Sequence, residues 1–319
     1  MTTYVLRRLL QWLPVLLVSS ILVFAVVRSL PGDAADVIAG PDASEEVVAA
    51  VRRAYGLDQP LPVQYLAWLG QLLQGNLGKS YIYHLDVGTL ILSRVPQSLL
   101  LAGMALLIAV AIGVPAGLVA GLRNGRWPDW MVSGGTAVAI ALPDFWFGML
   151  AILLFSVSLG WLPPGGFESL FDNPAGFYLS LVLPSATLAL TGTAVLARFT
   201  RSAVIETLGE DFVRTARAKG LNPLRIIFRH ILRNSLVPVI TMMGILFGRM
   251  LGGAVVIESL FAWPGVGRLL VQSIINRDYG VVQGVLVLLV VFFLAINLIV
   301  DLLYAAVDPR IRYAIEDNK

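Results

Sequence analysis

Six long apolar stretches constrain this 319-residue chain more than any other feature. Each is close in length to the ~20 apolar residues that a helix needs to cross the hydrocarbon core of a bilayer. Together they hold only three charged residues, Asp144, Arg249 and Asp301. The sequence therefore predicts an all-α integral membrane protein with six transmembrane helices. The predicted spans cover residues 9–27, 99–122, 131–159, 178–197, 236–257 and 281–307.

The first stretch differs from a secretory signal peptide, although Arg7 and Arg8 precede it. Its apolar run over residues 9–27 is longer than the roughly 7–15 residues of a signal-peptide core. No convincing small-residue cleavage site follows it. We therefore expect an uncleaved first span.

Composition excludes several classes of protein. Hydrophobic residues make up 57% of the chain, which is far too many for a disordered polypeptide. The absence of cysteine excludes a disulfide-stapled scaffold and a thiol enzyme.

His84 and His230 are predicted on opposite sides of the membrane, so they cannot share a metal ion. Residues 78–80 read Gly-Lys-Ser, like the end of a phosphate loop, but Leu73 stands where that motif needs glycine. We expect a non-catalytic chain with no cofactor or metal of its own.

The distribution of charge predicts the orientation in the membrane. With a cytoplasmic N-terminus, the inside segments sum to +8 and the outside segments to −5. An excess of lysine and arginine marks cytoplasmic loops, so both termini are predicted to be cytoplasmic. The net charge of +3 is thus the small difference between two sides of opposite sign. It does not indicate nucleic-acid binding.

The outer segment, residues 31–94, is long enough to form helices of its own. Asp42 and Glu45 resemble a capping box, and Gly56 suits the end of that helix. A second helix is predicted from Pro62 to just before Gly75. One face of this second helix carries Leu66, Leu69 and Leu73.

Glycines recur at four-residue spacing in the second and fifth spans. Such stripes let helix backbones approach closely in lipid, either as fixed packing or as a contact that slides during transport. The two series are Gly113, Gly117, Gly121 and Gly244, Gly248, Gly252.

The cytoplasmic segment between spans four and five is predicted to be a helix, a tight turn and a second helix. Gly220 suits the left-handed residue that ends the first helix. Asn222 and Pro223 suit the N-cap and first turn of the next. The second helix carries a basic row, namely Arg225, Arg229 and Arg233. This segment either anchors the chain on lipid phosphates or docks on a soluble partner; it lacks the aromatic residues of a nucleic-acid site.

The same segment resembles the loop of dipeptide/oligopeptide ABC importer permeases. The matching residues are 211–223 (Asp-Phe-Val-Arg-Thr-Ala-Arg-Ala-Lys-Gly-Leu-Asn-Pro) and 229–238 (Arg-His-Ile-Leu-Arg-Asn-Ser-Leu-Val-Pro). Further matches occur at 30–33, 55–60, 75–80, 159–163, 258–267, 276–279 and 308–310, so the resemblance covers nearly the whole chain. The general permease pattern begins Glu-Ala-Ala, whereas here Arg214, Thr215 and Ala216 stand in those positions. The peptide subfamily shares this change, and the long outer segment resembles its "B" permease.

This resemblance implies the type I ABC importer transmembrane fold with a small helical extracytoplasmic insertion. The implied domains are an N-terminal transmembrane helix (1–30), an extracytoplasmic segment (31–93), a permease domain (94–307) with a coupling loop at 198–235, and a cytoplasmic tail (308–319). It also implies a cell inner membrane location and four kinds of partner. These are a second permease, two ATP-binding subunits that hold ATP and Mg, an extracytoplasmic substrate-binding protein, and membrane lipid.

The resemblance assigns the loop to coupling with the ATP-binding subunits. The implied coupling residues are Asp211, Arg214, Thr215, Ala216, Arg217, Lys219, Gly220, Leu221, Asn222 and Pro223. The turn at Trp263, Pro264 and Gly265 is expected to pack under the outer segment, on the binding-protein side. An ionisable group within a span usually faces protein or water, which makes some in-membrane residues candidates for the translocation path. These candidates are Arg249, Asp144, Met243, Phe247 and Met250; a structural role is expected for Asp301.

The expected function is import of di- or oligopeptides. Glutathione and nickel importers have very similar permeases, so these substrates remain alternatives. An ion-coupled secondary transporter is the alternative from another class, and the scarcity of titratable groups in the spans argues against it.

Overall fold

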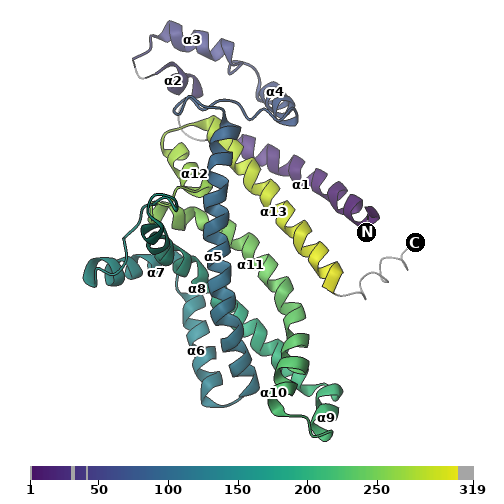
Figure 1. The fold of residues 1–319 in the computed structure, drawn as a ribbon. Coiled ribbons are helices and arrows are strands. Elements are labelled where there is room, and N and C mark those ends of the chain that lie inside the picture. Colours follow the sequence, from purple (N-terminus) through teal and green to yellow (C-terminus); the bar gives the residue numbers. More distant parts are fainter. Residues whose placement is uncertain (1, 30–32, 41, 308–319) are drawn as a thin grey trace. The chain divides into compact units, whose positions relative to one another are not determined.

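The computed structural model describes residues 2–29, 33–40 and 42–307, and helices form nearly all of their regular structure (Figure 1). One isolated β-bridge joins Lys79 and Asp86. The helices are α1 (Thr2–Ser29), α2 (Ala34–Ala39), α3 (Glu45–Ala54), α4 (Leu61–Leu73), α5 (Val87–Leu122), α6 (Trp127–Ala141), α7 (Asp144–Ala151), η1 (Ile152–Ser158), α8 (Pro174–Gly209), α9 (Asp211–Ala218), α10 (Pro223–Arg225), η2 (Ile226–Leu232), α11 (Arg233–Leu260), α12 (Val266–Ile275) and α13 (Tyr279–Val307).

Five helices in the described residues are long and apolar enough to cross a membrane, and a bent pair supplies the sixth span. The predicted third span is one stretch in the sequence, but the structure divides it into α6 and α7–η1 at an angle of 99°. The break falls at Leu142 and Pro143, whose backbones are extended. Proline has no N–H to continue a helix and pushes the preceding residue out of the helical region. The six-span prediction is confirmed, with one span broken.

The chain forms two compact units. The first comprises Met1–Ser98 and Pro264–Leu294, and the second Leu99–Trp263 and Ala295–Lys319. The core of the first unit consists of aliphatic side chains from α1, α5, α12 and α13. These are Val27, Val87, Leu90, Ile91, Val266, Leu269, Leu270, Val281, Val282 and Val285.

Two buried polar contacts hold this first unit together. The Ser80 hydroxyl donates to the carboxylate of Asp278, which is fully buried and lies just before α13. The Ser98 hydroxyl accepts a hydrogen bond of 2.8 Å from the Val266 N–H at the start of α12. Ser80 belongs to the 78–80 segment that looks like a phosphate loop, and its hydroxyl is occupied in this packing contact.

The predicted helices of the insertion after α1 are present, with one correction. The N-cap of α3 is Ser44, whose hydroxyl accepts from the Val47 N–H, and not Asp42. Gly56 ends this region with φ +62°, as predicted. On helix α4, Leu66 and Leu73 are exposed. Its packed face carries the two aromatic side chains that contact Phe24 of α1, which are Tyr65 and Trp68.

Asp33 connects the short helix α2 to α3. Its carboxylate accepts from the Ala35 N–H at 2.8 Å and pairs with Arg52 of α3. The backbone hydrogen bond from Ala35, followed by the contact with Arg52, holds the pKa of Asp33 below its usual value. This link joins α2 and α3 into one small cap.

Helix α8 is the centre of the second unit, with α6, α7 and α11 packed against it (Figure 1). Buried residues occur along most of its length, 17 of 36 in all, which explains why its apolar stretch is continuous. It also runs twelve residues past the end of the predicted fourth span, to Gly209. The helix therefore supports both the membrane core and the segment that follows it.

The glycine stripe of α5 lies directly against the backbone of α8. A methyl group added at Gly117 would lie 2.4 Å from the Ala197 carbonyl oxygen, and one at Gly113 would lie 2.7 Å from the Thr193 carbonyl oxygen. Gly252 of the fifth-span stripe differs, because a methyl group there would have no atom of the described residues within 4 Å. The first stripe is thus a packing contact within this chain, and Gly252 is not.

This contact predicts that Gly117→Ala destabilises the protein by about 2 kcal/mol, because the methyl group overpacks a backbone–backbone contact. The thermal unfolding midpoint in detergent measures the change. The control is Gly134→Ala in α6, where a methyl group meets no atom within 4 Å. That control should be neutral or stabilising by up to ~1 kcal/mol, because alanine favours helix. Equal midpoints for Gly117→Ala and the control would contradict the predicted overpacking.

Candidate functional site

The segment between α8 and α11 forms the predicted helix, turn and helix. The structure adds a break at Glu210, whose extended backbone separates α8 from the short helix α9. Gly220 has φ +69° and its N–H donates to the Arg217 carbonyl, so it ends α9 as the sequence predicts. The Asn222 side chain accepts from the Leu224 N–H at 2.9 Å and caps the next helix.

Helix α9 is fixed to the second unit by one buried face. Val213 is fully buried and Ala216 is 3% exposed. They pack against Val204 of α8 and Ile226 and Ile231 of η2. Because α9 has this apolar anchor, the turn at its end is held rigidly by two long helices.

The opposite face of α9 and the following turn is exposed and basic. Arg214 is 78% exposed and lies 3.4 Å from Asp211, one turn earlier. An ion pair this exposed adds little stability, so the charges remain available to a partner. The exposed basic residues of this surface are Arg214, Arg217, Lys219 and Arg225. We call them, with the exposed parts of α9 and the turn, the α9 tip.

Three exposed apolar side chains belong to the same region, and the sequence analysis missed them. They are Phe212, Leu224 and Phe228, which are 41%, 64% and 62% exposed. Large apolar groups beside cations are typical of protein-binding surfaces. The exposure of Phe212 could have been foreseen from α9, where Val213 and Ala216 define the buried side, but Leu224 and Phe228 lie in α10 and η2.

The other expected coupling residues divide between contact and support. Ala216 is buried and Leu221 half-buried, so these two hold α9 in place and do not form its outer surface. Asp211, Thr215, Gly220, Asn222 and Pro223 are exposed. The basic row runs from α10 through the π-helical segment η2 to the start of α11, where Arg225, Arg229 and Arg233 are all exposed.

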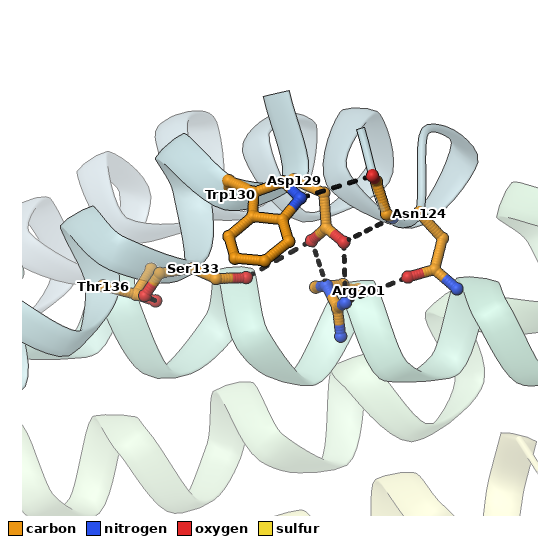
Figure 2. A network of polar contacts seen from close by, with 7 residues as sticks. Asn124, Asp129, Trp130, Ser133, Thr136 and Arg201 are labelled. Atoms are coloured by element: carbon orange, nitrogen blue, oxygen red, sulfur yellow. Dashed lines mark hydrogen bonds and ion pairs between the residues drawn. The ribbon is translucent and has the colours of Figure 1, made fainter. Parts of the chain in front are cut away.

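A polar clamp holds the α5–α6 turn on α8, close to its C-terminal end (Figure 2). Arg201 of α8 donates through two nitrogens to the two carboxylate oxygens of Asp129, which is 4% exposed. It also donates to the Asn124 side chain at 3.1 Å. The same carboxylate accepts from the Gly125 N–H at 2.9 Å and the Ser133 hydroxyl at 3.2 Å. A bidentate pair with these extra donors is geometrically specific.

The clamp was not predicted from the sequence, because its two charged members are 72 residues apart. It connects α6, the α5–α6 turn and α8 just before the chain enters α9.

The candidate path residues do not form one cluster in the described structure. Arg249 is exposed on α11, whereas Met250 is 5% exposed and belongs to the core of the second unit. Met243 and Phe247 are half-buried against that core. Asp144, the first residue of α7, accepts a hydrogen bond of 2.7 Å from the Thr191 hydroxyl. The side chain of Asp301 lies outside the described residues, as do residues 30–32 and 308–310 of the matched motifs.

The predicted turn at Trp263, Pro264 and Gly265 is present, and Trp263 is fully buried. Its ring meets Phe167 edge to face at 5.2 Å. Pro264 and Gly265 line a shallow pocket together with Tyr83, in keeping with a position beside the segment after α1.

Two family models match the chain. The model described as "Binding-protein-dependent transport system inner membrane component" matches residues 113–313. The model described as "Binding-prot-dependent transport system membrane comp, N-term" matches residues 1–102. Between them they cover both compact units.

Curated relatives match along nearly the whole chain. A Brucella abortus protein named "Putative peptide transport system permease protein" is 44% identical over 313 residues, covering 98% of this chain and 100% of the relative. The glutathione transport system permease protein GsiC of Salmonella typhimurium is 45% identical over 313 residues, again 98% and 100%.

Solved structures show the same fold. Inward-facing conformations of the MetNI methionine ABC transporter match with a TM-score of 0.57 and 20% identity, over 69% of this chain and 96% of that chain. An amino acid ABC transporter solved with histidines matches with a TM-score of 0.53 and 16% identity, over 69% and 94%. At these identities the likeness concerns the fold alone.

The clamp predicts that Asp129→Asn lowers the free energy of unfolding by about 2–3 kcal/mol, because the Arg201 guanidinium loses its counter-charge. Arg201→Gln should cost a similar amount, and the double variant clearly less than the two together. Thermal unfolding in detergent measures all three. The matched control is Arg198→Gln, three residues earlier on α8 and exposed, with an expected effect within about 0.5 kcal/mol. Strict additivity of the two clamp variants would rule out the pair as a coupled unit.

Proposed function

The chain belongs to the family of binding-protein-dependent transport system inner membrane components, and from that premise we propose that it imports di- or oligopeptides. It is a multi-pass inner-membrane permease of an ABC importer. The two curated relatives carry names for peptide and for glutathione transport. Glutathione is itself a small peptide, so it is the principal alternative substrate.

In the proposed complex, this chain is a non-catalytic subunit. A second permease completes the translocation path, and two ATP-binding subunits hold ATP and Mg. An extracytoplasmic binding protein delivers the substrate. The free energy for transport then comes from ATP bound by the partner chains, and this chain converts their movement into a change of its spans.

The observation that supports this role is the α9 tip. It is rigid on its buried side, at Val213 and Ala216, and presents cations and apolar side chains on its exposed side. Such a surface can be gripped by a soluble subunit. Helix α8 and the Arg201–Asp129 clamp provide the continuation, because they join the tip to α6 and the α5–α6 turn.

The proposed orientation places both termini and the α9 tip in the cytoplasm. Lysine and arginine are concentrated in the segments assigned to that side, and residues 197–235 alone sum to +5. Residues 31–93 and the turn at 263–265 then face the binding protein. Residues 94–307 form the proposed permease domain. Arg249 and Asp144 are the proposed polar members of its path, with Met243, Phe247 and Met250 as its apolar neighbours.

The coupling role predicts that reversing charge at the tip disconnects ATP hydrolysis from uptake. In proteoliposomes with the complete transporter, Arg214→Glu with Arg217→Glu should lower peptide uptake by about tenfold or more. The reason is that the two glutamates would repel the partner surface that the two arginines are proposed to attract. Membrane insertion should be unchanged. Gly220→Pro should act in the same direction, because proline cannot adopt φ +69° or donate to the Arg217 carbonyl.

The matched control is Arg123→Glu, an exposed arginine in the α5–α6 turn, on the same proposed side and outside the α9 tip. It should retain most of the uptake. Normal uptake by the Arg214/Arg217 double variant would exclude the tip as the coupling surface.

Competition for uptake separates the substrates. Excess unlabelled dipeptide or tripeptide should suppress ATP-dependent uptake of a labelled peptide, with glutathione weaker and nickel without effect. Stronger suppression by glutathione than by any peptide would assign the chain to glutathione import. Uptake that survives ATP depletion while an ion gradient persists would contradict ATP-driven import altogether.

A further inference from the structure

The first unit contains a pocket of about 250 Å³ that none of the assigned roles uses. It lies where the end of α1, the insertion helices and the start of α13 meet. Its wall includes Arg28 of α1, Trp68 of α4, Lys79 of the loop before α5 and Arg277 just before α13. In the proposed orientation this pocket opens on the side that receives substrate.

The charges of this pocket all have one sign. Arg28, Lys79 and Arg277 line it, and none of its described lining residues is acidic. The positive charge of Arg28 is partly balanced by Asp33, which lies near it and also pairs with Arg52. Lys79 and Arg277 form no ion pair with any described residue. A concave site with uncompensated cations attracts anions, although the outer segments as a whole carry negative charge.

The position of Arg277 is fixed by the end of helix α12. Its φ is +57°, its N–H donates to the Ile274 carbonyl, and the Asp278 N–H donates to the Ser273 carbonyl. This pair of hydrogen bonds is the Schellman motif, which ends a helix with one left-handed residue. The helix end therefore holds the backbone of Arg277 at the wall of the pocket.

Neutral polar groups complete the wall. The Gln64 amide nitrogen is held by the carbonyls of Leu57 and Gln59, at 3.1 and 2.7 Å. Its Oε1 atom is buried and has no hydrogen-bond partner among the described residues. A buried acceptor of this kind suits a donor such as a peptide N–H. Burial raises the pKa of Tyr81, also in the wall, to about 12, so its phenol stays neutral at physiological pH.

The size of the pocket restricts its occupant. Pockets that hold whole small-molecule ligands measure about 300–1,000 Å³, so 250 Å³ suits one end of a peptide and not a complete oligopeptide. We propose that this pocket binds the terminal carboxylate of a substrate peptide through Lys79 and Arg277 while the adjoining peptide group faces Gln64. The proposal rests on the peptide-import function and adds a substrate contact before the membrane path.

Peptide binding to the complete membrane complex, without the binding protein, tests this site. The probes are trialanine and trialanine amide, which differ only in the terminal carboxylate, and saturation-transfer NMR measures their dissociation constants. The wild type should bind the acid about tenfold more tightly than the amide, the difference expected from losing one charge-assisted hydrogen bond. Lys79→Gln with Arg277→Gln should remove this preference.

The matched control is Arg53→Gln, an exposed arginine of the same insertion that lies outside the pocket. It should keep the preference for the acid. Thermal unfolding of all variants in detergent should match the wild type, since the three substituted side chains are exposed. Equal affinity for acid and amide in the wild type, or an unchanged preference in the double variant, would overturn the proposal.

Two further measurements separate this proposal from others. If the double variant weakens docking of the substrate-free binding protein and leaves the acid preference intact, the pocket holds an acidic side chain of that partner and the proposal fails. ATP-driven uptake of trialanine by the wild type tests the proposed function independently. Absent uptake with an intact acid preference contradicts the peptide function alone, and normal uptake without the preference contradicts the pocket alone.

Discussion

The close approach of α5 to α8 is the contact on which the second unit depends. In lipid there is no hydrophobic force to push helices together, so packing and polar contacts must hold them. Gly113 and Gly117 allow α5 to lie on the backbone of α8, and that fixes the position of the longest buried helix. At 1.5 Å per residue, the 36 residues of α8 span about 54 Å, well beyond the ~30 Å hydrocarbon core. The part of α8 that exceeds this thickness carries Arg201 of the clamp and leads into the α9 tip.

Several polar groups in the helices of the second unit meet a polar group of a neighbouring helix. Asp144 accepts a hydrogen bond from Thr191, and Ser235 donates one to Thr207. Arg201 donates to the carboxylate of Asp129. Each contact joins two different helices of the second unit. An unpaired polar group costs several kcal/mol in a non-aqueous setting, so such contacts specify which helix faces which. The clamp also ties the α5–α6 turn to α8, the helix that leads into α9.

Local chemistry made some parts of the fold predictable. Gly220 and Gly56 were foreseen as turn residues because only a left-handed backbone ends those helices, and φ is positive at both. Asp42 was wrongly preferred over Ser44, since both are good N-caps and only the path of the backbone chooses between them. The turn at Trp263 was expected from the proline and glycine that follow it, but the contact of Trp263 with Phe167 was not. Neighbours far away in the sequence decide such cases.

The sequence by itself determined six apolar spans, the asymmetry of charge across them and the turn that interrupts the segment between α8 and α11. These follow from hydrocarbon thickness, from the cost of moving charge through lipid and from the dihedral preferences of single residues. Only the tertiary structure decided that Gly113 and Gly117 pack on α8, which face of α9 is exposed, that Arg201 meets Asp129, and that Lys79 and Arg277 line one pocket. Those outcomes depend on the distance between residues that are remote in sequence, which no local pattern encodes.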